Sequence, residues 1–175
     1  MLLVLRTLVY ATLFVGLLLV WLPARVLAWS GIVRPSGTAA AQLAGIFLAT
    51  SGGVLVLWCV SCFIRFGHGT PAPFDAPRQL VVRGPYRFVR NPMYIGAALT
   101  IAGAALAYRS AGLLIYACIF LLVFHAFVVF YEEPTLRRKF GAPYESYCRQ
   151  VRRWWPAWRP AHILEEKAAQ PLAGH

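Results

Sequence analysis

The chain has 175 residues, of which 59% are apolar and only 13% are charged. Charged residues make up about 25% of an average soluble domain, and a small fold leaves much of its surface exposed, so an ordinary soluble domain is excluded. Mean hydropathy is +0.61, and we expect lipid to cover the apolar surface. The net charge of +11 is better explained by juxtamembrane arginines than by a nucleic-acid surface, so no nucleic-acid partner is expected.

Four apolar runs follow one another, at 7–22, 38–64, 92–108 and 111–131. A helix needs about 20 apolar residues to cross the hydrocarbon core, with about 17 as the lower limit. The second and fourth runs are long enough, and the first is long enough once residues 2–5 join it. The third is marginal and is expected either to tilt or to belong to a tight hairpin. Because unpaired backbone groups find no partner in lipid, all four runs are predicted to be helices.

The first run also has the character of a secretory signal peptide. No small-x-small cleavage site leads from it into a soluble domain, and further apolar runs follow, so an uncleaved helix is favoured. The predicted fold class is therefore all-α, a polytopic membrane helical bundle of about four to five transmembrane helices.

The distribution of arginines predicts the orientation. They concentrate between the second and third runs and after the fourth, whereas the other side carries only Arg25, Arg34 and Arg109. The positive-inside rule then places the 65–90 loop and the C-terminal tail together in the cytoplasm. We expect an integral, multi-pass membrane protein whose active site faces the cytoplasm.

Three parts of the chain are predicted. Residues 1–64 form two N-terminal transmembrane helices. Residues 65–159 form a catalytic part, made of a cytosolic loop, a transmembrane hairpin and a C-terminal helix. Residues 160–175 form a flexible polar tail.

The C-terminal helix is predicted from apolar and aromatic residues spaced by three and four positions. It is expected to be amphipathic, cytosolic and close to the lipid headgroups, with an imperfection at Gly141 and Pro143. The residues that define this pattern are Leu136, Phe140, Tyr144, Tyr147 and Val151.

Two adjacent acids, Glu132 and Glu133, end the fourth apolar run. Carboxylates at the C-terminal end of a helix face the negative end of its dipole, so helix stability does not favour them there. One explanation is pairing with Arg137 or with the arginines of 83–90. The other is a binding site for a cationic or hydroxyl-rich ligand, since an acid at a membrane border is a functional candidate.

Two smaller features bear on the site. Pro92 suits the first turn of a helix, and Asn91 before it is a candidate N-cap. Cys59 and Cys62 lie within an apolar run, and no second pair of ligands stands at zinc spacing, so no metal site is predicted.

Residues 80–96, LVVRGPYRFVRNPMYIG, resemble the signature of the isoprenylcysteine carboxyl methyltransferase family. That family belongs with the membrane phospholipid N-methyltransferases in one superfamily. Its pattern is G-x-Y, a spacer and R-H-P-x-Y-x-G, followed after a membrane hairpin by E-E-x-x-L, F-G, spaced tyrosines and a basic tail. Order and spacing fit over roughly 65–156, whereas residues 1–64 are similar only in being apolar helices.

The resemblance implies a methyltransferase that uses S-adenosyl-L-methionine, with a membrane lipid or a lipidated molecule as the acceptor. In that family the cofactor lies in a cytosolic pocket built from the two polar segments. Carboxylates suit its ammonium group or ribose diol, aromatic faces suit its sulfonium, and an arginine suits its carboxylate. Either Arg87 or Arg90 could hold that carboxylate. Carried over by position or as neighbours, the other cofactor-binding residues are Gln79, Leu80, Val81, Tyr86, Asn91, Pro92, Met93, Tyr94, Glu132 and Glu133.

Two departures from the pattern affect the expected chemistry. Asn91 replaces the usual histidine and cannot titrate near neutral pH, so a positioning role is favoured over a general base. Val128 stands where carboxyl methyltransferases of this family have an arginine that grips the substrate carboxylate. Without that arginine an anionic acceptor loses a charge-assisted hydrogen bond worth about 1.5–3 kcal/mol. Arg90 and His125 are the candidate catalytic residues, although His125 also suits a structural role between helices.

The acceptor stays open at this point. A phospholipid amine or another small hydrophobic nucleophile needs no carboxylate clamp, whereas an isoprenylated cysteine does. A nicotinamide-dependent membrane reductase of the related sterol reductase type is a second reading. A non-enzymatic membrane partner is a third, but such a protein would be expected to lose the paired glutamates, which are intact.

Overall fold

The computed structural model describes residues 12, 15–31, 39–67 and 80–161. All regular secondary structure within these ranges is helical, so the prediction of an all-α fold is confirmed for the described part. The α-helices are α2 (Leu22–Trp29), α3 (Ala39–Cys62), α4 (Pro92–Tyr108), α5 (Ala111–Phe127), α6 (Glu133–Phe140) and α7 (Ala142–Gln150). Three π-helical turns, Gly16–Trp21, Phe63–Gly67 and Val128–Glu132, and one 3-10 turn, Gly84–Arg87, extend or connect them.

Two of the described helices are long and apolar enough to cross a membrane, Ala40–Phe66 and Ala111–Phe140. Only 22% of the most apolar 18-residue stretch of each is buried, which is unlike the core helix of a soluble protein. Gly16–Trp29 and Pro92–Tyr108 are shorter apolar helices. The count of four to five spans therefore stays a prediction.

The first apolar run differs from expectation at its end. Its helix continues through α2 to Trp29 rather than ending at residue 22, and Pro23 stands where the π-helical turn Gly16–Trp21 joins α2. Most of the run's beginning, including residues 2–5, lies outside the described residues.

Helices α4 and α5 form a tight hairpin with only two residues between them. Arg109 takes a left-handed conformation (φ 49°, ψ 40°) that ends α4. The Ser110 side chain then accepts a hydrogen bond from the Leu113 N–H at 3.2 Å and caps α5. The hairpin alternative for the marginal third run is confirmed.

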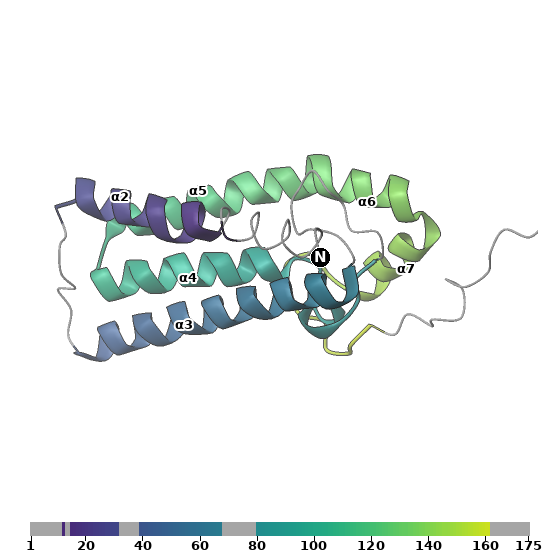
Figure 1. The fold of residues 1–175 in the computed structure, drawn as a ribbon, viewed down its shortest axis with the longest axis horizontal. Helices are drawn as coiled ribbons and strands as arrows, with labels where there is room; N and C mark the ends of the chain where they lie inside the picture. Colours follow the sequence, from purple (N-terminus) through teal and green to yellow (C-terminus); the bar gives the residue numbers. More distant parts are fainter. Residues whose placement is uncertain (1–11, 13–14, 32–38, 68–79, 162–175) are drawn as a thin grey trace, which may run out of the picture.

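Helices α3 and α4 lie side by side and antiparallel along most of their length (Figure 1). Their backbones meet at small residues: a Cβ added to Gly52 would stand 2.5 Å from the Gly96 carbonyl oxygen, and one added to Gly103 would collide with the backbone of Ala49. Such close approach is how helices associate in lipid, where apolar burial between helices brings little gain.

The three helices α3, α4 and α5 share one apolar core, to which Val56, Ile101 and Phe120 contribute. The segment before α2 joins this core, and the Tyr116 hydroxyl donates to the Leu18 carbonyl at 2.9 Å. The core therefore fixes the relative positions of the helix ends. One of these ends, where α3 ends and α4 begins, is called the polar end of the bundle.

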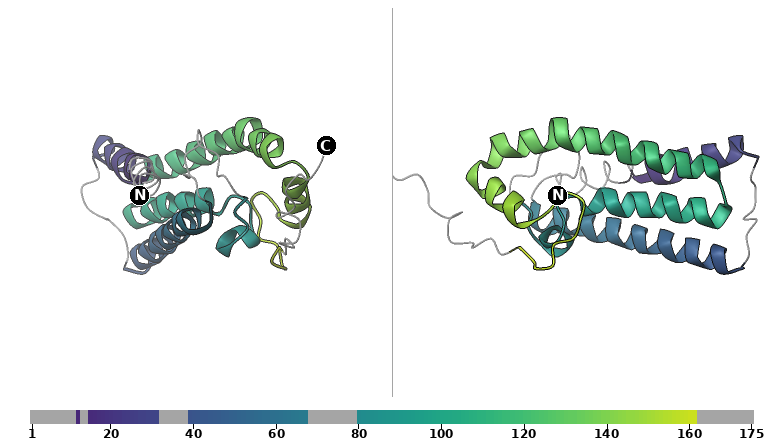
Figure 2. Two further views of the ribbon diagram at one scale, coloured as in Figure 1. Left: turned by 45° about the vertical axis from the view of Figure 1, so that its right-hand side comes forward. Right: turned by 180° about the vertical axis from the view of Figure 1, so that it is seen from behind.

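The described parts of the two polar segments, residues 80–91 and 133–161, lie at that one end, where α3 ends and α4 begins (Figures 1 and 2). Helix α5 continues through the turn Val128–Glu132 into α6. The helix ends at Gly141 (φ 55°), and α7 then folds back. The predicted C-terminal helix is thus two short helices, and its position relative to headgroups stays a prediction.

A final segment, residues 151–161, crosses over the loop before α4, and we call it the strap. The Ala157 N–H donates to the Phe88 carbonyl at 2.7 Å, and the Ala161 N–H donates to the Arg87 carbonyl at 2.9 Å. Ala161 is buried, and residues 162–175 of the predicted tail lie outside the described residues.

We predict that Gly52→Ala destabilises the protein while Gly53→Ala does not. The new methyl group at residue 52 would force α3 and α4 apart, and overpacking of this kind costs about 1–3 kcal/mol. A Cβ at Gly53 meets no atom within 4 Å, so the same substitution one residue away is a matched control. Thermal unfolding in detergent measures both, and equal melting temperatures would contradict the close packing.

Ser110→Ala is expected to lower stability by about 1 kcal/mol, because it removes the cap of α5. Ser61→Ala serves as the control, since the Ser61 hydroxyl only donates back to the Leu57 carbonyl of its own helix. The same melting experiment compares them, and a Ser61 variant that loses as much stability would rule out the capping explanation.

Candidate functional site

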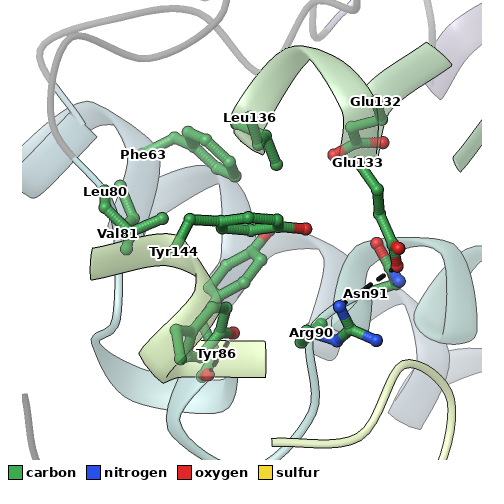
Figure 3. A pocket seen from close by; sticks show the side chains of 11 residues that line it. Phe63, Leu80, Val81, Tyr86, Arg90, Asn91, Glu132, Glu133, Leu136 and Tyr144 are labelled. Carbon is green, nitrogen blue, oxygen red and sulfur yellow. Dashed lines mark hydrogen bonds and ion pairs between the residues drawn. The ribbon is translucent and has the colours of Figure 1, made fainter. Parts of the chain in front are cut away.

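A pocket lies at the polar end of the bundle, between the end of α3, the loop before α4, the α5–α6 junction and α7 (Figure 3). The pocket is open on one side, and its empty space together with the adjoining solvent amounts to about 500 Å³. Its lining residues are Phe63, Leu80, Val81, Tyr86, Arg90, Asn91, Glu132, Glu133, Leu136, Tyr144 and Tyr147.

Two π-helical turns bring side chains of the long helices into this pocket. Phe63 opens the turn at the end of α3, and Glu132 closes the turn at the end of α5. A π-helical turn changes the facing of the residues after it and is often found at functional sites. Glu132 and Glu133 both line the pocket, although they are neighbours on one helix.

Glu133 is held by two arginines. Its Oε1 lies 2.7 Å from Arg153 Nε and 3.2 Å from Arg90 Nη1, and its Oε2 accepts from Arg153 Nη2 at 2.9 Å. The Glu133 side chain is only 8% exposed. The hydrogen bond to Glu133 raises the pKa of the Arg153 guanidinium above its usual value.

The ion pairs of Glu133 show which of the expected arginine partners, Arg137 or the arginines of 83–90, bind the paired acids. An arginine of the 83–90 group, Arg90, does pair with Glu133. Arg137 instead faces Glu145 at 4.0 Å. Arg153, the stronger partner of Glu133, was not expected, because it lies 20 residues further along the chain.

Glu132 has a different environment from its neighbour. Its Oε2 accepts a hydrogen bond from the Tyr94 hydroxyl at 3.1 Å, and it forms no ion pair with any described residue. The Tyr94 ring is fixed by stacking on Phe124, with 4.8 Å between centroids. The pocket thus contains one carboxylate that is positioned but not neutralised by an arginine.

The Arg90 guanidinium belongs to the same pocket, and only some of its N–H groups have partners among the described residues. Its Nη1 contacts Glu133 and lies 2.8 Å from the Cys148 sulfur. Its Nε is buried and has no hydrogen-bond partner in the part of the chain that the structure describes. Buried N–H groups are nearly always paired, so this nitrogen is an exception among the described residues.

The remaining wall is aromatic and apolar (Figure 3). Phe63 meets Tyr86 edge to face at 5.4 Å, and the Tyr147 hydroxyl donates to the Tyr86 carbonyl at 2.6 Å. Burial raises the pKa of the phenols of Tyr86, Tyr144 and Tyr147, so all three stay neutral at physiological pH. One side of the pocket is apolar and the other is charged.

Asn91 is the N-cap residue of α4, as predicted, but its side chain makes no capping hydrogen bond. Its Nδ2 donates instead to the Arg153 carbonyl at 3.2 Å, because the strap offers an acceptor there.

Seven of the residues predicted for the site line the pocket: Leu80, Val81, Tyr86, Arg90, Asn91, Glu132 and Glu133. Tyr94 reaches it indirectly through its hydrogen bond to Glu132. Gln79 lies outside the described residues.

Three predicted cofactor contacts do not line it. Pro92 is fully buried at the start of α4, and Met93 packs against the apolar core. Arg87 Nε donates to the Ala161 carbonyl at 3.4 Å, so it binds the strap.

His125 does not line the pocket either. It is exposed rather than packed between helices, and its Nδ1 accepts from Trp154 Nε1 at 3.0 Å. Its catalytic role stays a prediction. Val128, at the position of the missing arginine, is fully buried and also lies off the pocket.

Four lining residues were not predicted: Phe63, Leu136, Tyr144 and Tyr147. The last three carried a signal, since they belong to the pattern that defines the C-terminal helix and to the family signature. Nothing in the sequence distinguishes Phe63 from the other apolar residues of its run.

A model of the phospholipid methyltransferase family matches residues 40–143, which is more than half of the chain. The match extends from the first turn of α3 to the first turn of α7 and includes both glutamates. Searches of curated proteins and of solved structures found no match. The family match confirms the superfamily that the signature indicated, and with it a membrane methyltransferase that acts on a lipid-type acceptor. The chain belongs to the phospholipid methyltransferase family.

Proposed function

We propose that the protein transfers a methyl group from S-adenosyl-L-methionine to a nucleophile on a lipid-like acceptor, in the pocket at the polar end of the bundle. One observation carries this proposal: Glu132, a carboxylate that forms no ion pair with any described residue, lines the same aromatic pocket as Arg90.

The chemistry of the lining residues fits the cofactor. Glu132 can accept from its ammonium group or its ribose hydroxyls, and the Arg90 guanidinium can donate to its carboxylate. The rings of Tyr86 and Tyr144 offer aromatic faces to a cation. When bound, the cofactor supplies an activated methyl group on a sulfonium.

The protein's own contribution is then positioning and exclusion of water. The pocket wall formed by Tyr86, Tyr144 and Tyr147 is neutral and holds no general base. Asn91, which does not titrate, donates its amide to the strap and fixes the loop before α4. His125 remains a candidate for an acceptor-side group that lies outside this pocket.

For the acceptor we favour a phospholipid amine or another small hydrophobic nucleophile over a carboxylate. Val128 is buried and off the pocket, and the one lining arginine already shares Glu133. An anionic acceptor would therefore have no dedicated cation among the described lining residues.

Glu132→Gln is expected to weaken the affinity for S-adenosylhomocysteine by at least about tenfold, because a charge-assisted hydrogen bond is worth about 1.5–3 kcal/mol. Isothermal titration of the purified protein, in detergent and in nanodiscs, measures this. Glu145→Gln makes the same chemical change on the exposed face of α7 and should bind like the unmodified chain. Absence of binding by the unmodified chain in both media would refute the proposed cofactor.

Labelled S-adenosylmethionine added to membranes that contain the protein is expected to label the lipid fraction. Mild alkali separates the possible acceptors, since methyl esters release methanol whereas N-methyl groups do not. We expect the label to survive alkali. Quantitative release as methanol would instead identify a carboxylate acceptor. Membranes that carry the Glu132→Gln variant provide the background.

A further inference from the structure

The strap lies beyond the family match, which ends at residue 143, so that match assigns it no role. It carries two strongly exposed tryptophans, since Trp155 is 74% exposed and Trp158 is fully exposed. Phe88, which is 42% exposed, stands next to them, because its carbonyl accepts from the N–H of Ala157 between the two tryptophans. Exposed apolar rings that gather on one surface mark an interaction site.

Positive charge accompanies these rings. Arg152 and Arg159 are exposed and lie on either side of the two tryptophans in the strap. The sequence from 146 to 161 contains no acid, so the strap has no counter-charge of its own. Glu133, which does contact the strap, is already paired with Arg153 and Arg90. The anchor surface, as we call it, consists of Phe88, Arg152, Trp155, Trp158 and Arg159.

The backbone that presents the anchor surface is fixed to the rest of the protein on two sides. On the side of the loop before α4, the Arg90 N–H donates to the Arg152 carbonyl at 3.0 Å. On the side of α5, Trp154 Nε1 donates to His125 Nδ1 at 3.0 Å. The anchor surface is therefore part of the folded structure, and its rings and cations keep their relative positions.

The strap is held at the level where the apolar helices give way to polar sequence. Arg153 binds Glu133, which follows directly on the apolar part of the long helix Ala111–Phe140. Arg152 is bonded to Arg90, two residues before α4 begins. Tryptophan rings and arginines at such a boundary are typical of the membrane interface, where the rings lie among the headgroups and the cations meet negative charge.

We propose that the anchor surface binds anionic phospholipid headgroups of the leaflet at the polar end of the bundle. An interfacial lipid offers apolar contact to the rings and a phosphate to the guanidinium groups. A zwitterionic headgroup has the same phosphate but no net charge, so the arginines favour an anionic lipid. This inference concerns contact with the bilayer, and its test does not depend on the methyl donor or the acceptor.

Liposomes of phosphatidylcholine with a small fraction of nitroxide-labelled lipid test the inference, because a nitroxide on carbon 5 of an acyl chain quenches tryptophan fluorescence near the interface. The label is carried either by phosphatidylglycerol or by phosphatidylcholine. We expect labelled phosphatidylglycerol to quench the strap tryptophans with an apparent affinity at least about tenfold higher, since two arginines near an anionic surface shift affinity by about that factor. A Trp155→Phe, Trp158→Phe variant supplies the signal of the other tryptophans, and high salt should abolish the preference.

The charge is tested with a matched pair of variants. Arg152→Gln combined with Arg159→Gln should bring the apparent affinities for the two labelled lipids within about twofold of each other. Arg138→Gln combined with Lys139→Gln removes the same charge from exposed positions of α6 and should keep the preference. By the helix rise, Arg138 lies about 9 Å further along the long helix than Glu132, beyond the level of the strap.

Equal quenching by the two labels in the unmodified chain would overturn the inference, and so would a preference that survives the Arg152 and Arg159 substitutions. Absence of quenching by either label would overturn it too, because the tryptophans would then face water, a protein partner or a second copy of the chain. If the Arg152 and Arg159 variant fails to fold, the salt series on the unmodified chain decides. A preference that persists at high salt would refute binding through charge.

Discussion

The carboxylate of Glu133 joins three segments that are far apart in the chain. It stands at the start of α6, Arg90 lies just before α4, and Arg153 lies on the strap. Taking this group out of water is costly, and its two guanidinium partners offset that cost. Removing one partner of such a buried pair typically costs about 3–5 kcal/mol, because the remaining charge is left uncompensated. The loop, the long helix and the strap therefore hold their relative positions around the pocket through one shared anion.

The packing of α3 against α4 makes this possible. Because their backbones approach closely at Gly52 and Gly103, the end of α3 and the start of α4 are fixed relative to each other. Phe63 and Tyr86 can then meet across that end at 5.4 Å. The interface between α3 and α4 therefore has two effects. It holds the helices together in lipid, where burial of apolar surface brings little gain, and it fixes the distance between the pocket walls at their ends.

The sequence predicted most of what depends on local pattern. The run 92–108 coincides with α4. The paired glutamates stood out because helix energetics did not favour them, and the family resemblance then implied that they belong to the site, where both line the pocket. What it could not predict are contacts between distant segments. The partner of Asn91 is a carbonyl 62 residues away, and no local rule distinguishes that from a helix cap.

The aromatic wall illustrates the same limit. Tyr144 and Tyr147 were recognised as the buried face of an amphipathic helix, but periodicity alone does not reveal what that face covers. The break at Gly141 turns α7 back toward the loop before α4, and this turn converts a packing face into a pocket wall. His125 likewise required the structure, since its partner Trp154 lies 29 residues further along.

The unbroken helix Ala111–Phe140 has a geometric consequence for the reaction. At 1.5 Å per residue, its 30 residues extend about 45 Å, which exceeds the thickness of about 30 Å of the hydrocarbon core. Glu132 lies about 32 Å from the first residue of that helix by the same rise. A helix that enters the hydrocarbon at Ala111 therefore carries this carboxylate to the opposite boundary, level with the headgroups. At that depth an acceptor can keep its acyl chains in the bilayer while its polar end meets a water-borne methyl donor.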